Sequence, residues 1–162
     1  MITAAIRYET DGYVTSGARL MGRQSAGLGM LRAIVAAADP HEGLTGIGPN
    51  PASAAPFSLQ VGELRPGLRT SWIGFHEIER MATKGVVYTP DPNLGTLANL
   101  RLRTGVASFS ITGVTHTTAT AAAMGFIGDL VSEPVMPWDA LICTSQSVRQ
   151  TVNQLLDAKG EY

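Results

Sequence analysis

His116 is the residue whose type and position point most directly to chemistry. It follows the apolar run SITGVT at 110–115, typical of a β-strand, and precedes the alanine-rich stretch 118–130, typical of a helix. In an open parallel sheet, ligands bind beyond the carboxyl ends of the strands. A neutral imidazole at that edge can accept or donate a hydrogen bond without carrying a charge, which makes His116 a candidate ligand contact. The alternative is a structural histidine that bonds to a neighbouring loop.

Polar side chains next to two expected strand ends are further candidates. Thr117 and Thr118 follow His116, and either hydroxyl can cap the next helix and leave free backbone N–H groups facing a ligand. Tyr88 and Asp91 lie at the end of an earlier apolar run, GVVYTP at 85–90. Asp91 can accept hydrogen bonds from sugar hydroxyls, or it can form a turn before the following proline. Both interpretations of Asp91 stay open.

The glycine-rich stretch 22–30 does not fit the common nucleotide-binding motifs. Gly22 and Gly27 have P-loop spacing, but Leu28 and Gly29 stand where that motif needs Lys and Ser or Thr. In a dinucleotide fingerprint, Arg32 would replace the third glycine, and the expected second strand ends without an acidic residue. Both an NTPase and a nicotinamide-binding enzyme are therefore disfavoured. The stretch is expected to be either a loop that lets the backbone approach a ligand or a plain surface loop.

The sequence also argues against metal, thiol and hydrolase chemistry. HEIER at 76–80 begins like a zinc-protease helix, but Arg80 replaces the second histidine. With three histidines and one cysteine in the whole chain, we expect no metal site and no cofactor. Cys143 lies in an apolar run and is interpreted as a core thiol. A G-x-S-x-G nucleophile elbow is missing from the sequence.

Composition limits the class of protein. The chain has 162 residues, enough for one domain, and a formal net charge of −1 with acidic and basic residues interspersed. This distribution does not suggest binding to nucleic acid or to an anionic membrane. No run approaches the roughly 18 apolar residues of a membrane-spanning helix. One cysteine excludes a disulfide framework, and the absence of a signal-peptide core predicts a cytoplasmic location.

Apolar runs alternate with helical patterns along the chain. The strands are expected at 2–8, 43–48, 69–75, 85–90, 105–115 and 139–145. Helices are expected between them, among them one that ends near residue 38, one at 54–64 and a last one capped by Ser145. Near-continuous apolar strands alternating with helices predict a parallel sheet covered on both faces. The predicted fold is α/β, a Rossmann-like three-layer αβα sandwich with a mostly parallel sheet of about six strands.

Two long segments resemble the N-terminal domain of retaining glycosyltransferases of the GT-B fold, a group that includes bacterial glycan and phosphoinositol-mannoside synthases. In VASFSITGVTHTTATAAAMGFIGDL, Thr115-His116-Thr117 matches the family's Thr/Ser-His-Thr/Asp/Asn motif at a strand end. In PWDALICTSQSVRQTVNQLL, a later strand leads through Ser145 into an amphipathic helix, as in the family. A glycine-containing loop is matched loosely by 12–29. The resemblance covers most of the chain and is strongest over 84–157.

The resemblance implies a protein of two Rossmann-like domains with the active site in the cleft between them. Residues 1–162 would be the N-terminal, acceptor-side domain, without the C-terminal domain that binds the nucleotide-sugar donor. His116 would contact the transferring sugar, and the glycine loop would approach the donor phosphates. The residues implied to bind substrate there are Gly22, Arg23, Gln24, Gly27, Thr117, Thr118 and Ser145, with Tyr88 and Asp91 at the neighbouring strand end.

A complete enzyme of this kind transfers a sugar from a nucleotide-sugar to a glycan or small-molecule acceptor. Transfer would depend on orientation and on stabilising an oxocarbenium-like charge, because the sequence suggests no paired carboxylates. The chain is then expected to be inactive alone and to need a C-terminal domain in cis or in trans. Its cleft face would also allow a homo-oligomer. The alternative is a free-standing, non-catalytic Rossmann-like module that binds a small molecule or a protein partner.

Overall fold

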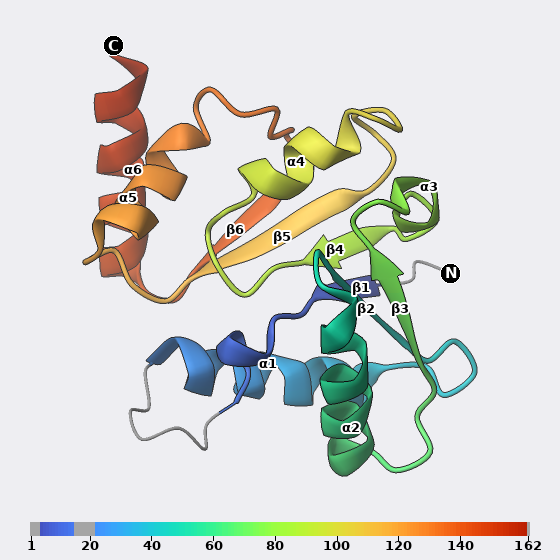
Figure 1. The fold of residues 1–162 in the computed structure, drawn as a ribbon. Coiled ribbons are helices and arrows are strands. Elements are labelled where there is room, and N and C mark those ends of the chain that lie inside the picture. The colour runs from blue at the N-terminus through green and yellow to red at the C-terminus, as the bar shows by residue number, and fades with distance from the viewer. Residues whose placement is uncertain (1–3, 15–21, 162) are drawn as a thin grey trace.

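The protein has a Rossmann-like α/β fold, seen in a computed structural model that describes residues 4–14 and 22–161. Six strands within these residues form one all-parallel sheet in the order β3-β2-β1-β4-β5-β6 (Figure 1). The strands are β1 (Ala4–Arg7), β2 (Leu44–Gly48), β3 (Thr70–Gly74), β4 (Val86–Tyr88), β5 (Ser110–Thr115) and β6 (Ala140–Cys143). The fold class predicted from the sequence is confirmed, and the sheet is wholly parallel.

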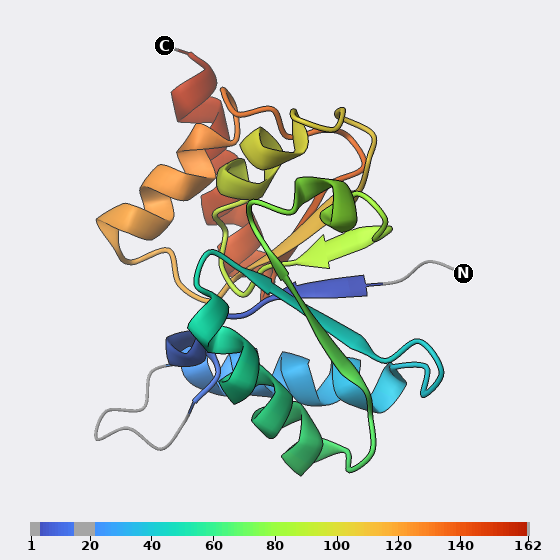
Figure 2. The same ribbon diagram turned by 45° about the vertical axis from the view of Figure 1, so that its right-hand side comes forward.

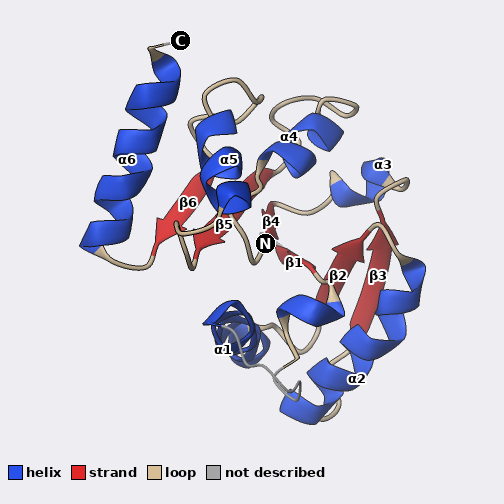
Figure 3. Ribbon diagram, turned by 60° about the vertical axis from the view of Figure 1, so that its left-hand side comes forward, coloured by secondary structure: helices blue, strands red, loops and turns tan. Residues whose placement is uncertain are grey.

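Helices cover both faces of the sheet, which produces the three layers (Figures 1 and 3). They are α1 (Gly22–Ala37), α2 (Ala54–Leu64), α3 (Ile78–Met81), α4 (Gly95–Arg101), α5 (Ala121–Asp129) and α6 (Gln146–Gly160), with short 3-10 turns η1 (Thr10–Gly12) and η2 (Pro51–Ser53). The helices α1 and α2 lie on one face, whereas α3 and α4 lie on the other (Figure 2). The helices α5 and α6 pack on each other beside β6.

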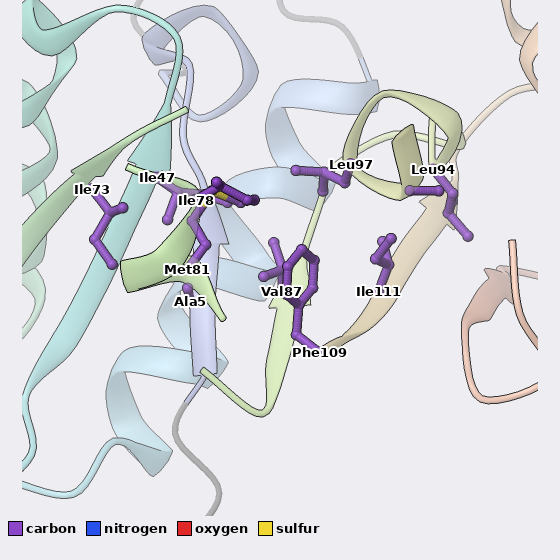
Figure 4. Close-up of a cluster of buried hydrophobic side chains, with 11 residues drawn as sticks. Ala5, Ile47, Ile73, Ile78, Met81, Val87, Leu94, Leu97, Phe109 and Ile111 are labelled. Carbon is purple, nitrogen blue, oxygen red and sulfur yellow. The ribbon is translucent and has the colours of Figure 1, made fainter. Parts of the chain in front are cut away.

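Each face of the sheet has its own hydrophobic core. On one face, Leu31 of α1 and Phe57 of α2 pack with Ile6 of β1. On the other face, Leu97 of α4 packs with Ala5 of β1 and with residues of the neighbouring strands and of α3 (Figure 4). Consecutive residues of β1 therefore enter opposite cores, which explains why the inner strands are continuous apolar runs rather than alternating ones.

Two expected element boundaries are wrong. Residues 105–109 were expected to begin the fifth strand, but β5 begins at Ser110. Gly105 has a φ of +107°, a conformation that suits glycine in a turn, and Val106 is 39% exposed. The second error concerns the glycine-rich stretch, because residues 22–30 belong to α1 and not to a loop.

Gly27 explains why a helix can carry glycine at this place. A Cβ atom at Gly27 would lie 2.2 Å from the backbone oxygen of Gly12, so only glycine lets α1 approach η1 this closely. Gly29 is two residues further along the same helix, and a Cβ there would meet nothing within 4 Å. The glycine at 27 therefore serves helix packing.

We expect opposite effects when these two glycines are replaced by alanine. Gly27→Ala must push α1 away from η1 and should lower the free energy of unfolding by about 1–3 kcal/mol. Gly29→Ala should raise it by about 0.5–1 kcal/mol, since alanine is the better helix former. Urea denaturation of the two variants measures both values. If the Gly27→Ala variant were as stable as Gly29→Ala, α1 would not pack as closely on η1 as the structure shows.

The loop that leads into β6 is fixed by a fully buried ion pair. Arg101 at the end of α4 and Asp139 just before β6 both have 0% side-chain exposure, and the guanidinium holds both carboxylate oxygens at 2.7 Å. Bidentate geometry of this kind combines charge with directional hydrogen bonding. The pair joins α4 to the edge of the sheet on the side opposite α1. None of the helices in the described ranges is long and apolar enough to cross a membrane.

Candidate functional site

The sheet has a topological switch point between β1 and β4. From β1 the chain order runs outward through β2 and β3 on one side and through β4, β5 and β6 on the other. Connections therefore leave the carboxyl ends of β1 and β4 in opposite directions and open a crevice, the usual ligand position in such sheets. A small hollow of about 20 Å³ lies there, lined by Arg7, Glu9, Gly12, Pro90 and Asp91.

His116 lies at this edge, as the sequence predicts. It directly follows β5, and its Nε2 is 2.7 Å from the carbonyl oxygen of Pro90, which follows β4. A carbonyl can only accept, so Nε2 carries the hydrogen and donates it. In the neutral ring Nδ1 is then the acceptor, and Nδ1 is buried with no partner among the described residues. The imidazole is anchored at one nitrogen and has acceptor capacity at the other.

Unpartnered polar atoms concentrate at this end of the central strands. In the described part of the chain, six buried side-chain nitrogen or oxygen atoms have no hydrogen-bond partner. Four of them belong to Arg7, Tyr88, Thr115 and His116, at the carboxyl ends of β1, β4 and β5. Native proteins leave few buried polar groups unsatisfied, so a cluster at one edge indicates a place for an additional polar partner.

Asp91 has a turn-forming role as well as a place in the hollow. Its Oδ1 accepts from the backbone N–H of Asn93 at 2.9 Å and from the hydroxyl of Thr89 at 3.4 Å. This arrangement is an Asx turn that shapes the chain between β4 and α4. Asp91 also lines the hollow, so the two interpretations left open by the sequence are compatible.

Tyr88 is a core residue, 6% exposed, on the same face of the sheet as α1. Tyr13 stands near it and donates its hydroxyl to the carbonyl oxygen of Arg7. Burial raises the pKa of both phenols above the ordinary value of 10.0, and the nearby charge of Asp91 raises the pKa of each further. Both tyrosines thus remain protonated in the folded protein when free tyrosine would ionise.

We expect stability to fall at alkaline pH for this reason. A phenol whose pKa is raised in the folded state contributes stability that is fully present below pH 10, the pKa of the phenol in the unfolded chain. This stability is lost as the pH rises above that value. The urea midpoint should therefore be lower at pH 11 than at pH 8. Tyr88→Phe should reduce this loss, and at pH 8 it should change stability by less than about 1 kcal/mol because its hydroxyl has no partner to lose. A pH dependence that is unchanged in Tyr88→Phe would contradict the assignment.

The four residues expected in a glycine loop lie in the first turns of α1 instead. Gly22 begins the helix, Gln24 is buried at 8% exposure, and Gly27 packs on η1. The side chain of Arg23 lies outside the described residues, as does the segment 15–21. The helix continues through these positions because the close contact at Gly27 favours packing over an open phosphate-binding loop. Gly27 packs on Gly12, which lines the crevice.

The cap of α5 is a correction to the sequence prediction. Thr120, and not Thr117 or Thr118, accepts the hydrogen bond from the N–H of Ala123. Thr117 is exposed and accepts from the N–H of Ala119, which closes the turn after His116. The reason is length, because the chain needs four residues after His116 to turn from the sheet into the helix. Thr118 is half-buried.

Ser145 is separate from the crevice. It caps α6 as predicted, accepting from the N–H of Val148 at 3.1 Å. It lines a different hollow, between β6 and α6, together with Cys143 and Arg149. Helix capping therefore explains why a serine stands at this strand end in the matched segment.

Sequence reasoning missed Arg7 and Glu9 in this crevice. Arg7 ends a strand whose preceding residues are apolar, and this change of polarity at a strand end was the available signal. Glu9 reaches the crevice because the chain after β1 turns at once into η1. The Asp11-Gly12 dipeptide predicts a turn here, but not which side chains the turn brings to the crevice.

Larger hollows exist away from this edge. One of about 300 Å³ lies at the amino ends of the strands, lined by Ala4, Leu44 and Lys84. Another of about 350 Å³ lies between α1 and α2 and includes Arg32 and Glu63. The described residues contain no group of three or more His, Cys, Asp or Glu side chains placed to hold a metal ion.

Comparisons with known proteins add no relative. No family model, no curated protein and no solved structure matches this chain. Function must therefore be inferred from the chain's own residues and their arrangement.

Proposed function

We propose that this chain is the acceptor-side domain of a GT-B retaining glycosyltransferase, and that the edge around His116 binds the sugar. The single observation that supports this is the cluster of unpartnered buried polar atoms at the carboxyl ends of β1, β4 and β5. Sugars carry many hydroxyls that both donate and accept, so they can satisfy such a mixed set of donors and acceptors. The motif Thr115-His116-Thr117 adds the family resemblance.

His116 has the central role in this proposal. The bond from its Nε2 to the Pro90 carbonyl fixes the plane of the ring and the tautomer. Its Nδ1 would accept a hydrogen bond from a hydroxyl of the sugar. Because Nδ1 and the Tyr88 hydroxyl are covered, we expect binding to move the turn after His116. The histidine would then position the sugar and contribute a fixed dipole near the charge that develops on it.

The proposal requires a second domain, in cis or in trans, to hold the nucleotide part of the donor. Such domain pairs form the active site in the cleft between them, and the switch-point crevice would face that cleft. The acceptor would be a glycan or a small molecule bound on the side of the cleft formed by this chain. An experiment must identify the nucleotide and the sugar of the donor.

A titration of the isotope-labelled chain tests the proposal. UDP-, GDP- and ADP-sugars, NAD and FMN would be added separately while backbone amide shifts are followed. The proposal predicts weak, sugar-dependent shifts at residues 116–119, 89–91 and 7–13. Tight binding of NAD or FMN would instead support a redox enzyme, and tight binding of a sugar-free ligand without any second domain would support a binding module. Shifts confined to the groove between α1 and α2 would also contradict the proposal.

A further inference from the structure

Arg7 has a contact pattern that the sugar-binding role of His116 does not explain. Its Nε and Nη2 donate to the same oxygen of Glu9, Oε1, at 3.0 and 2.8 Å. Its guanidinium carbon lies 5.9 Å from the ring centroid of Phe75, and its side chain is 13% exposed. The guanidinium is thus held in one orientation by a carboxylate on one side and an aromatic ring nearby.

One nitrogen of this guanidinium is left without a partner. Nη1 of Arg7 is buried and has no hydrogen-bond partner in the described ranges. Arg7 lines the small hollow with Glu9 and Asp91, and no described residue donates a hydrogen bond to Oδ2 of Asp91. The residues that line the hollow therefore include a guanidinium with an unused donor group and two carboxylates. Its volume of about 20 Å³ suits one group of the size of a water or a hydroxyl.

The charge of the hollow favours a neutral ligand group over an anion. Arg7 contributes one positive charge, whereas Glu9 and Asp91 contribute two negative ones. A phosphate or carboxylate would meet net repulsion from these charges. A hydroxyl can accept from Nη1 of Arg7 and donate to a carboxylate oxygen at the same time, which uses both kinds of group.

We propose that Arg7, Glu9 and Asp91 form a subsite for a single hydroxyl of a neutral, polyhydroxylated acceptor, and that Glu9 sets this preference by neutralising Arg7. The inference rests on the proposed function and adds the class of acceptor to it. The acceptor is an uncharged sugar or cyclitol at the position that contacts this hollow. Glu9 holds the guanidinium in place and also makes the hollow unfavourable for anions.

The test compares binding of neutral and phosphorylated probes. Methyl glucoside, myo-inositol and glucose 6-phosphate are titrated into labelled protein, and dissociation constants are taken from the amide shifts of residues 7–12 and 89–91. For the wild type we expect at least one neutral probe to bind more tightly than glucose 6-phosphate. Arg7→Gln should weaken neutral binding about tenfold, the usual effect of losing one hydrogen bond to a charged group.

Glu9→Gln is the sharper variant, because Glu9 is half exposed and its replacement leaves the fold intact. It removes one of the two carboxylate charges at the hollow, so we expect affinity for glucose 6-phosphate to rise about tenfold relative to affinity for the neutral probes. Arg80→Gln is the matched control. Arg80 of α3 forms an ion pair with Glu77, the residue before α3, and removing it should leave all three dissociation constants unchanged.

The outcomes separate this inference from the proposed function. No shifts at Arg7, Glu9 and Asp91 with any probe would overturn the subsite. An unchanged ratio of glucose 6-phosphate affinity to neutral-probe affinity in Glu9→Gln would also overturn it. Tighter binding of glucose 6-phosphate to the wild type would show an anion site and also overturn it. If nucleotide-sugars still shift His116, the proposed function stands without the subsite. If neutral probes behave as expected but nucleotide-sugars bind nowhere, the subsite stands and the glycosyltransferase proposal fails.

Discussion

Replacing Asp139 by alanine is expected to lower the free energy of unfolding by about 3–5 kcal/mol, the largest stability effect we predict. Oδ1 of Asp139 accepts from Arg101 and from the backbone N–H of Ile111, and Oδ2 accepts from Arg101 and from the N–H of Met136. The variant leaves the Arg101 charge buried without its counter-ion. It also leaves two backbone N–H groups without their acceptors, so the loss exceeds that of one hydrogen bond.

Denaturation in guanidinium chloride at pH 7 measures this effect, and an exposed ion pair provides the control. Asp129 and Lys159 approach to 3.8 Å, and both side chains are about half exposed. Asp129→Ala should therefore cost less than about 1 kcal/mol. Asp139→Asn keeps the shape of the side chain, and it replaces Asp139→Ala in the experiment if the alanine variant does not fold. Equal losses in Asp129→Ala and Asp139→Ala would show that the buried pair does not stabilise the loop before β6.

Replacing His116 by alanine is expected to have the largest effect on function. In an enzyme completed by a donor-binding domain, we expect the rate of sugar transfer to fall about 100-fold, the scale reported for losing one fixed dipole at a developing charge. Stability should fall by only about 1 kcal/mol, the contribution of the bond to the Pro90 carbonyl. Rates with saturating donor and acceptor, together with urea midpoints, separate these two effects.

His76 offers a matched control for His116. It also follows a strand, β3, but this strand is at the edge of the sheet and two strands away from β1. His76 is exposed, and its ring lies against the backbone of Gly74. His76→Ala should leave transfer within about twofold of the wild type, since a surface histidine contributes little. If His116→Ala transferred sugar as fast as His76→Ala, His116 would not belong to the site.

The fold could be predicted from the sequence because its signals are local. Continuous apolar runs such as 86–88 identify inner parallel strands, and the serine before residues 146–160 marks a helix start that the structure confirms. The error at residues 105–109 has the same origin. Val106 and Ala107 look like strand residues, but they follow a helix end and form a turn at Gly105. An apolar residue type does not by itself indicate burial.

The candidate site was predicted only in part, because its members meet through long-range contacts. The position of His116 follows from strand phase, whereas its bond to Pro90 depends on the pairing of β4 with β5. The helix at residues 22–30 packs through the contact of Gly27 with Gly12. The pattern of apolar residues along the chain does not predict this contact. Arg7 enters the crevice through the order of the strands around β1. Such contacts are properties of the topology and not of any single segment.

Direct contact between His116 and a sugar is the central claim, and intermolecular nuclear Overhauser effects measure it. The chain contains three histidines, so selective carbon-13 labelling gives three assignable rings. With a nucleotide-sugar bound, we predict cross-peaks from the sugar protons to the ring of His116. We predict none to His76, or to His41 at the opposite end of the sheet. Cross-peaks to either of those rings, or to the groove between α1 and α2, with none to His116 would contradict the account.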